Sequence, residues 1–167
     1  PVQVAMLTNQ LQALAYGVYL RPDQALNPPP ALLVAPTTPN LGIFQRSSQR
    51  IPLFVGVEQM GDDVVNTSLR QGFTSLPSPM ALGATWNPEL IESIGTIVGR
   101  ELTAVGVNLL LGPGLDVLEQ PRTDVGAGLG VQSFGGDPYW VGLLGRAYIS
   151  GIHQGSNQRV ATMASHF

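Results

Sequence analysis

The sequence contains no cysteine and no lysine, so all of its 8 basic residues are arginine. Without cysteine, the chain has no disulfide bridge, no thiol nucleophile and no cysteine-ligated metal centre. Without lysine, it has neither a Schiff-base amine nor the lysine of a phosphate-binding loop. Its formal net charge of −3 also argues against the basic surface of a general nucleic-acid binder. We therefore expect no nucleic-acid partner, no cofactor and no metal site.

Charge of either sign is scarce, at 11% of the residues, whereas 44% are hydrophobic. A chain of 167 residues is long enough for one domain with a sizeable core. So little charge is unusual for a surface wholly in contact with water. We expect part of that surface to be covered by the remainder of its own fold or by another subunit. No apolar run approaches the roughly 20 residues of a membrane span, and no signal peptide is visible, so secreted, envelope and cytoplasmic locations all stay open.

The N-terminal part divides into two segments. Residues 1–20 are predicted to be helical because Leu7, Leu11, Leu14 and Val18 recur at helical spacing. Residues 21–50 are rich in proline, which fixes φ and removes backbone donors, so we expect an extended excursion. Within it, only residues 31–35 have the composition of a short strand.

Residues 51–167 alternate between short apolar runs and amphipathic helices. The runs typical of buried strands are 52–57, 107–111 and 160–164. Helices are predicted to begin at Asn87-Pro88 and Asp137-Pro138, because the Asx side chain caps the first turn and proline fits it. They should end at Gly106 and at Gly151 or Gly155. The apolar stripe of the first helix would include Leu90, Ile97, Val98 and Leu102; polar loops are expected over 59–86 and 124–136.

This alternation indicates an α/β fold with a parallel sheet covered on both faces. Two architectures fit it. A doubly wound sheet would carry a glycine fingerprint after its first strand, and none follows that strand here. A closed barrel takes eight strand–helix units and typically about 250 residues, so three strands cannot close one. The pattern alone favours part of a barrel only slightly.

A series of motifs decides between the two architectures. In chain order they are Ile51-Pro52-Leu53 with Glu58-Gln59 and Gly61, then 76–84, Asn87–Leu90, Gly99–Leu102, Gly106–Asn108, Gly112–Val117, Ser133–Pro138 and His166-Phe167. Their order and spacing resemble the N-terminal barrel domain of glycoside hydrolase family 3, particularly its bacterial β-N-acetylhexosaminidase branch. The resemblance implies part of a TIM-like (β/α) barrel over residues 51–167. About three βα units with parallel strands would be present, not closed within this chain.

The resemblance also implies a sugar pocket at the carboxyl ends of the strands. The substrate-binding residues it assigns are Glu58, Asp116, Gln132, Ser165 and His166. The sequence departs from the usual family pattern in several places: Glu58 replaces aspartate, Met60-Gly61-Asp62-Asp63 replaces Glu-Gly-Gly-Arg, Gln132 replaces arginine and Ser165 replaces lysine. Three cationic positions are therefore neutral or acidic, and their charge-assisted hydrogen bonds to sugar hydroxyls are lost.

Retaining glycosidases use two carboxylates, one as nucleophile and one as acid/base. The resemblance places both after His166-Phe167, so we assign no catalytic residue and expect these 167 residues alone to be inactive. The chain is interpreted as a fragment, or a divergent member, of an enzyme hydrolysing β-linked N-acetylhexosaminides or glucosides. The alternative is a non-catalytic structural or assembly subunit built on a degenerate barrel, with the proline-rich segment as its contact surface.

Other residues have competing interpretations. Glu58 with Asp62 and Asp63 resembles a cation site, although a solvated acidic loop is the preferred interpretation. Trp140 falls on an apolar helix stripe and is expected in the core. Trp86, which precedes a helix, is left open between sugar stacking and a structural role.

Overall fold

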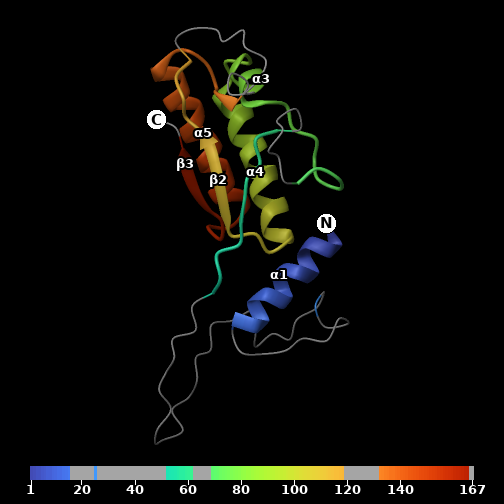
Figure 1. The fold of residues 1–167 in the computed structure, drawn as a ribbon. Helices are drawn as coiled ribbons and strands as arrows, with labels where there is room; N and C mark the ends of the chain where they lie inside the picture. The colour runs from blue at the N-terminus through green and yellow to red at the C-terminus, as the bar shows by residue number, and fades with distance from the viewer. Residues whose placement is uncertain (16–24, 26–51, 62–68, 119–131, 166–167) are drawn as a thin grey trace, which may run out of the picture. The chain divides into compact units, whose positions relative to one another are not determined.

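The computed structural model describes residues 1–15, 25, 52–61, 69–118 and 132–165 (Figure 1). The chain divides into two compact units, residues 1–54 and residues 55–167. The first contains helix α1 (Val2–Ala15). The second contains, in order, β1 (Gly56–Val57), α3 (Pro79–Gly83), α4 (Pro88–Ala104), β2 (Leu109–Gly114), α5 (Pro138–Gly155) and β3 (Ala161–Ser165). No helix in the described ranges is long and apolar enough to cross a membrane.

Helix α1 confirms the helical prediction for its described residues. Leu7, Leu11 and Leu14 lie on it and are exposed. The Gln12 side chain donates to the Leu53 carbonyl at 2.8 Å and accepts from the Leu53 N–H at 3.0 Å. The predictions for Val18, for the proline-rich segment and for the strand at 31–35 fall outside the described residues.

The three strands form one parallel sheet in the order β1-β2-β3, as the alternating pattern predicted. Asn108 joins all three of them. Its Oδ1 accepts from the Val55 N–H at 2.7 Å and its N–H donates to the Val55 carbonyl at 3.2 Å. On the other side, the Ala161 N–H donates to the Asn108 carbonyl at 2.9 Å. One residue therefore sets where β1 and β3 begin relative to β2.

The first strand is shorter than the predicted 52–57, because only Gly56 and Val57 pair with β2. Pro52 has no N–H to donate. Both backbone groups of Leu53 are bonded to the Gln12 amide. A side chain thus replaces the sheet as the partner of this segment.

The second strand is displaced from the predicted 107–111 to 109–114. At the end of α4 the Gly106 N–H donates to the Thr103 carbonyl at 3.1 Å, and the Val107 N–H donates to the Leu102 carbonyl at 3.0 Å. Gly106 has φ of 78°. This is a Schellman ending, so Val107 closes the helix rather than opening the strand. The glycine stop is confirmed, whereas the strand boundary was wrong.

Helix α3 lies inside the segment predicted to be a polar loop, so that part of the prediction was wrong. Ser78 caps it by accepting from the Ala81 N–H at 3.4 Å, and Pro79 occupies its first turn. A Cβ atom at Gly83 would lie 1.8 Å from the Phe134 carbonyl oxygen. The helix has only five residues, too few for apolar periodicity to reveal it.

Helices α4 and α5 pack through glycines. A Cβ atom at Gly99 would lie 2.4 Å from the Ile152 carbonyl oxygen, and one at Gly151 would lie 2.1 Å from the Glu92 carbonyl oxygen. The predicted apolar stripe of α4 is therefore only partly buried. Leu90 and Ile97 are exposed, because glycines rather than large side chains occupy the centre of the helix contact.

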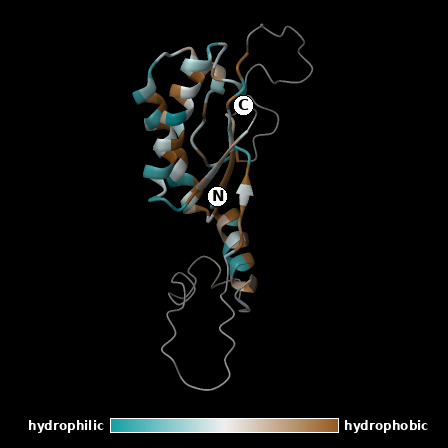
Figure 2. Ribbon diagram, turned by 90° about the vertical axis from the view of Figure 1, so that its left-hand side faces the viewer, coloured by the Kyte–Doolittle hydropathy of each residue, from teal (hydrophilic) through white to brown (hydrophobic). Residues whose placement is uncertain are grey.

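The two faces of the sheet differ in burial. Leu110 of β2 is fully buried, whereas Met163 of β3 is 52% exposed. Helices α4 and α5 cover the same face (Figure 1), and the hydrophilic parts of their ribbons lie mostly on the side away from the strands (Figure 2). Among the described residues of this unit, the expectation of a sheet covered on both faces holds for one face only.

Tyr148, a residue of α5, lies in the core. Its ring packs edge-on against Phe134 with the centroids 6.1 Å apart, and the residue is 6% exposed. Burial raises the pKa of the Tyr148 phenol well above its usual value, because the phenolate would lose its solvation.

The helix contact predicts opposite effects for two glycine-to-alanine substitutions in α5. Gly151→Ala places a methyl group against backbone and should lower the free energy of unfolding by about 1–3 kcal/mol. Gly142 has no atom within 4 Å of its notional Cβ, so Gly142→Ala should raise it by about 0.5–1 kcal/mol through helix propensity. Urea unfolding followed by circular dichroism measures both. Equal urea midpoints for Gly151→Ala and Gly142→Ala would contradict the close packing of α4 against α5 at Gly151.

Tyr148 predicts a loss of stability at alkaline pH. Below about pH 10, the phenol is protonated in both states; above it, the unfolded chain loses a proton that the folded chain keeps. Unfolding therefore becomes more favourable as the pH rises. The wild type should lose more stability than Tyr148→Phe between about pH 10 and pH 12. Tyr139→Phe alters an exposed ring and should keep the wild-type dependence of the free energy of unfolding on pH. If Tyr148→Phe shows that same dependence, the Tyr148 phenol does not contribute to it.

Candidate functional site

The parallel sheet brings the residues after each strand to one edge. Glu58 directly follows β1, Asp116 lies two residues beyond β2, and Ser165 is the last residue of β3. Parallel strands direct their carboxyl ends the same way, and in barrels of this kind the ligand binds at that end. Figure 1 shows that end beside the N-termini of α4 and α5. The topology thus places three of the predicted site residues on one side of the sheet.

Backbone contacts hold the ends of β2 and β3 together. The Leu115 N–H donates to the Ser165 carbonyl at 2.8 Å. Gln132 passes close to the end of β2, since a Cβ atom at Gly114 would lie 3.2 Å from its carbonyl oxygen. The loop that precedes α5 therefore returns to the same edge.

Ser133 fixes that loop to the end of β2. The residue is fully buried, and its hydroxyl donates to the Asp116 carbonyl oxygen. The Gly135 N–H donates to Ser133 Oγ at 3.1 Å, and the Leu118 N–H donates to the Gly135 carbonyl at 3.0 Å. The sequence predicted no role for Ser133, although it opens one of the quoted motifs. Its function is to position Asp116 and Gln132 relative to each other.

The four described site residues, Glu58, Asp116, Gln132 and Ser165, are half-buried, so each lies at the surface without being fully solvated. His166 falls outside the described residues. So do Asp62 and Asp63, and with them the proposed cation site. Among the described residues, no group of three or more His, Asp or Glu side chains is arranged to hold a metal ion.

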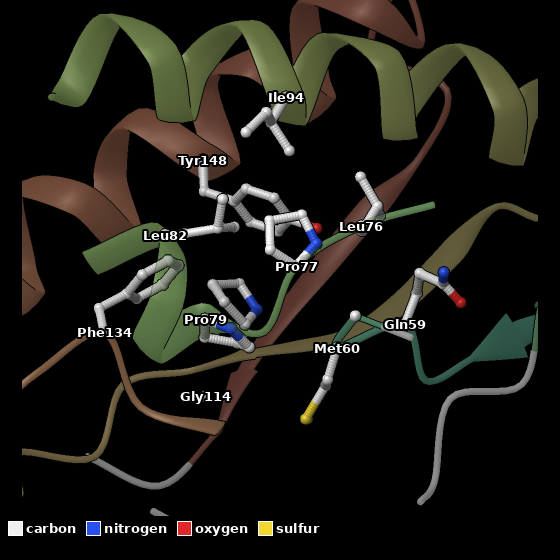
Figure 3. Close-up of a pocket in the computed structure, with 12 residues that line it drawn as sticks. Gln59, Met60, Leu76, Pro77, Pro79, Leu82, Ile94, Gly114, Phe134 and Tyr148 are labelled. Carbon is white, nitrogen blue, oxygen red and sulfur yellow. The ribbon is translucent and has the colours of Figure 1, made fainter. Parts of the chain in front are cut away.

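A small apolar pocket, partly open to solvent, lies beside this edge (Figure 3). Its lining comes from several elements and includes Met60, Leu82, Ile94, Pro113, Phe134 and Tyr148. Since Ile94 and Tyr148 belong to α4 and α5, the pocket faces the helices. None of the four described site residues lines it. We assign it to the core rather than to a sugar site.

The two tryptophans meet at the helix N-termini. The Trp86 and Trp140 ring centroids lie 4.9 Å apart at an interplanar angle of 88°. Trp86 is 59% exposed. Trp140 is half-buried against it, so the expectation of a core position for Trp140 was wrong. Its neighbour on the helix stripe, Val141, fills the core instead.

Comparison with known proteins agrees with the motif series. The profile described as "Glycosyl hydrolase family 3 N terminal domain" matches residues 40–167. A β-hexosaminidase of Pseudomonas aeruginosa is 36% identical over 119 residues, which is 71% of this chain and 33% of that protein. Probable β-glucosidase J of Neosartorya fischeri is 39% identical over 80 residues, 48% of this chain and 9% of that protein.

A solved structure resembles the chain over its full length. The glycoside hydrolase family 3 β-N-acetylglucosaminidase of Paenibacillus sp. superposes with a TM-score of 0.71 at 30% identity, covering 100% of this chain and 24% of that one. The chain thus spans a third or less of each of these relatives. Because they are bacterial and fungal, the bacterial origin suggested by the motifs stays a prediction.

The matched region contains the three strands, their carboxyl-end residues, helices α4 and α5 and both tryptophans. The fold is that of part of a family 3 TIM-like barrel, with three parallel strands in an open sheet. The chain belongs to glycoside hydrolase family 3.

Proposed function

We propose that this chain supplies about three strand–helix units of a barrel that hydrolyses β-linked N-acetylhexosaminides or glucosides. In this proposal Glu58, Asp116, Gln132 and Ser165 hold the sugar, together with His166. The observation that carries it is the convergence of three strand ends and the Ser133-anchored loop on one edge of the sheet. The relatives named above support the substrate class, since each carries the name of a hydrolase of β-linked sugars.

The chemistry of these side chains fits hydroxyl recognition. A carboxylate accepts hydrogen bonds from hydroxyl groups, and Gln132 offers both a donor and an acceptor. Such bonds are stronger when one partner is charged, so Glu58 and Asp116 would contribute most of the specificity. With Gln132 and Ser165 in place of cationic residues, the site should bind sugar more weakly than a fully basic one.

The register supports a binding role, rather than a catalytic one, for the two carboxylates. Glu58 follows Val57, which pairs with Leu110, whereas Asp116 lies beyond the end of β2. Their backbones are thus offset along the strands. A retaining glycosidase needs its two carboxyl groups only about 5–5.5 Å apart. We propose that these 167 residues by themselves bind sugar without hydrolysing it.

Sugar binding can be measured by isothermal titration with N-acetylglucosamine and with glucose. Replacing Glu58 by glutamine removes the charge but keeps the shape, so Glu58→Gln should weaken binding roughly tenfold through the loss of a charge-assisted hydrogen bond. Glu92→Gln is the matched control. Glu92 accepts from the Ser150 hydroxyl on α5, and its replacement should leave the affinity unchanged.

Two results would contradict this proposal. Equal affinities for Glu58→Gln and the wild type would remove Glu58 from the site. Turnover of an aryl β-glycoside or an aryl N-acetylglucosaminide by this chain, abolished by Glu58→Gln, would show that the chain carries its own catalytic carboxylate.

The Ser133 anchor predicts a coupled loss of stability and binding. Ser133→Ala removes the buried hydroxyl that donates to the Asp116 carbonyl and should lower the free energy of unfolding by about 1–3 kcal/mol. Because the loop then loses its attachment, sugar affinity should fall as well. Ser150→Ala, which removes an exposed hydroxyl, should change stability by less than about 0.5 kcal/mol. Chemical unfolding and titration of the same samples give both quantities; unchanged affinity in Ser133→Ala would show that the loop does not shape the site.

A further inference from the structure

Three aromatic side chains, Trp86, Tyr139 and Trp140, form a cluster that we call the aromatic platform. The Tyr139 and Trp140 ring centroids lie 6.0 Å apart at 79°, so each outer ring meets Trp140 edge-on. Tyr139 is 72% exposed and Trp86 is 59% exposed. Exposed apolar side chains that lie together in this way, rather than singly, are a feature associated with binding surfaces.

The platform lies toward the end of the sheet at which the carboxyl ends of the strands are found. Trp86 precedes Asn87, the N-cap of α4, and Trp140 is in the first turn of α5. Both helix N-termini lie at the carboxyl-end side of the strands in Figure 1.

The backbone holds Trp86 in an unfavourable conformation. Its φ of 51° is in the left-handed region, which is costly for a bulky side chain. Its N–H donates to the Gly83 carbonyl at 3.1 Å, while the following residue, Asn87, accepts from the Leu90 N–H at 2.9 Å. Strain of this kind is concentrated at binding sites and persists because neighbouring contacts impose it. The structure thus fixes an indole ring in an exposed position.

Each of the two N-cap residues beside the platform has one polar side-chain atom that takes no part in capping the helix. Asn87 uses Oδ1 for capping and Asp137 uses Oδ1 to accept from the Trp140 N–H at 3.0 Å. Within the described part of the chain, Asn87 Nδ2 and Asp137 Oδ2 make no hydrogen bond, and both residues are exposed. A donor and an acceptor therefore flank exposed aromatic faces.

We propose that the aromatic platform is a second carbohydrate-binding surface, distinct from the strand-end site, that holds a ring of a β-linked oligosaccharide. A pyranose ring has an apolar C–H face, which would stack on Trp86, and hydroxyl groups at its rim, which would bond to Asn87 and Asp137. Large rigid aromatic rings provide such contact at little cost in conformational entropy. The ligand class rests on the proposed function, since it assumes β-linked sugars.

The two tryptophans of the chain are both in the platform, so fluorescence excited where tryptophan but not tyrosine absorbs reports on this surface. Titration with tri-N-acetylchitotriose and with cellotriose should give a saturable change for at least one of them. Trp86→Gly should weaken that binding at least about tenfold. Because glycine accepts a positive φ, this variant should keep a melting temperature near that of the wild type. Asn87→Ser, which retains a good cap but loses the amide donor, should weaken binding less.

Further measurements separate this inference from the proposed function. Glu58→Gln should reduce the calorimetric signal of N-acetylglucosamine at the strand ends but leave the fluorescence titration unchanged. Suppose that calorimetry shows N-acetylglucosamine binding at the strand ends while the wild-type tryptophan fluorescence is unchanged by either trisaccharide. In that case the platform inference is wrong and the proposed function stands. Equal trisaccharide affinity in Trp86→Gly and the wild type would also overturn the platform. So would sedimentation showing that Trp86→Gly dissociates a dimer, since the surface would then join two copies. Absence of both signals would overturn both proposals.

Discussion

The register of the sheet depends on Asn108, whose backbone and side chain bond to the segments that begin the two flanking strands. The Oδ1 atom replaces a ladder partner for the Val55 N–H, and the carbonyl accepts from Ala161 on the other side. A one-residue slip would turn every strand side chain to the opposite face. Leu110 would leave the core, and the residues after the strands would no longer meet at one edge. The position of the candidate site is therefore set at the opposite end of the sheet.

The packing of α4 against α5 imposes a second constraint, on the distance between the two helices. Gly95 and Gly99 of α4 face Gly151 and Gly155 of α5, and each notional Cβ would lie within 2.4 Å of a backbone oxygen of the other helix. The helices can approach this closely only without side chains at the contact. Their N-termini then come close enough for Trp86 and Trp140 to touch. The same packing that completes the core thus assembles an aromatic surface outside it.

Features fixed by local chemistry could be predicted from the sequence, whereas those fixed by distant contacts could not. The caps at Asn87 and Asp137 and the stop at Gly106 depend on residues within one turn of them, and all three were predicted. The extent of β2 depends on pairing with β3 through Gly114, and helix α3 depends on the Phe134 backbone, so neither had a readable signal. For the candidate site, the positions of the predicted strands in the sequence indicated which residues lie together at the carboxyl ends of the sheet. The anchoring role of Ser133 requires a partner 17 positions away, which no local pattern reveals.

The outer edge of β3 has a consequence for how the sheet can be extended. Met163, exposed on β3, belongs to a parallel strand that pairs with β2 alone among the described elements. A strand edge without a neighbour presents a row of unused backbone donors and acceptors, which another chain can pair with. Among the described elements, the outer edge of β3 is thus a place where the sheet can be extended, either by further strands of the same barrel or by a strand of another chain.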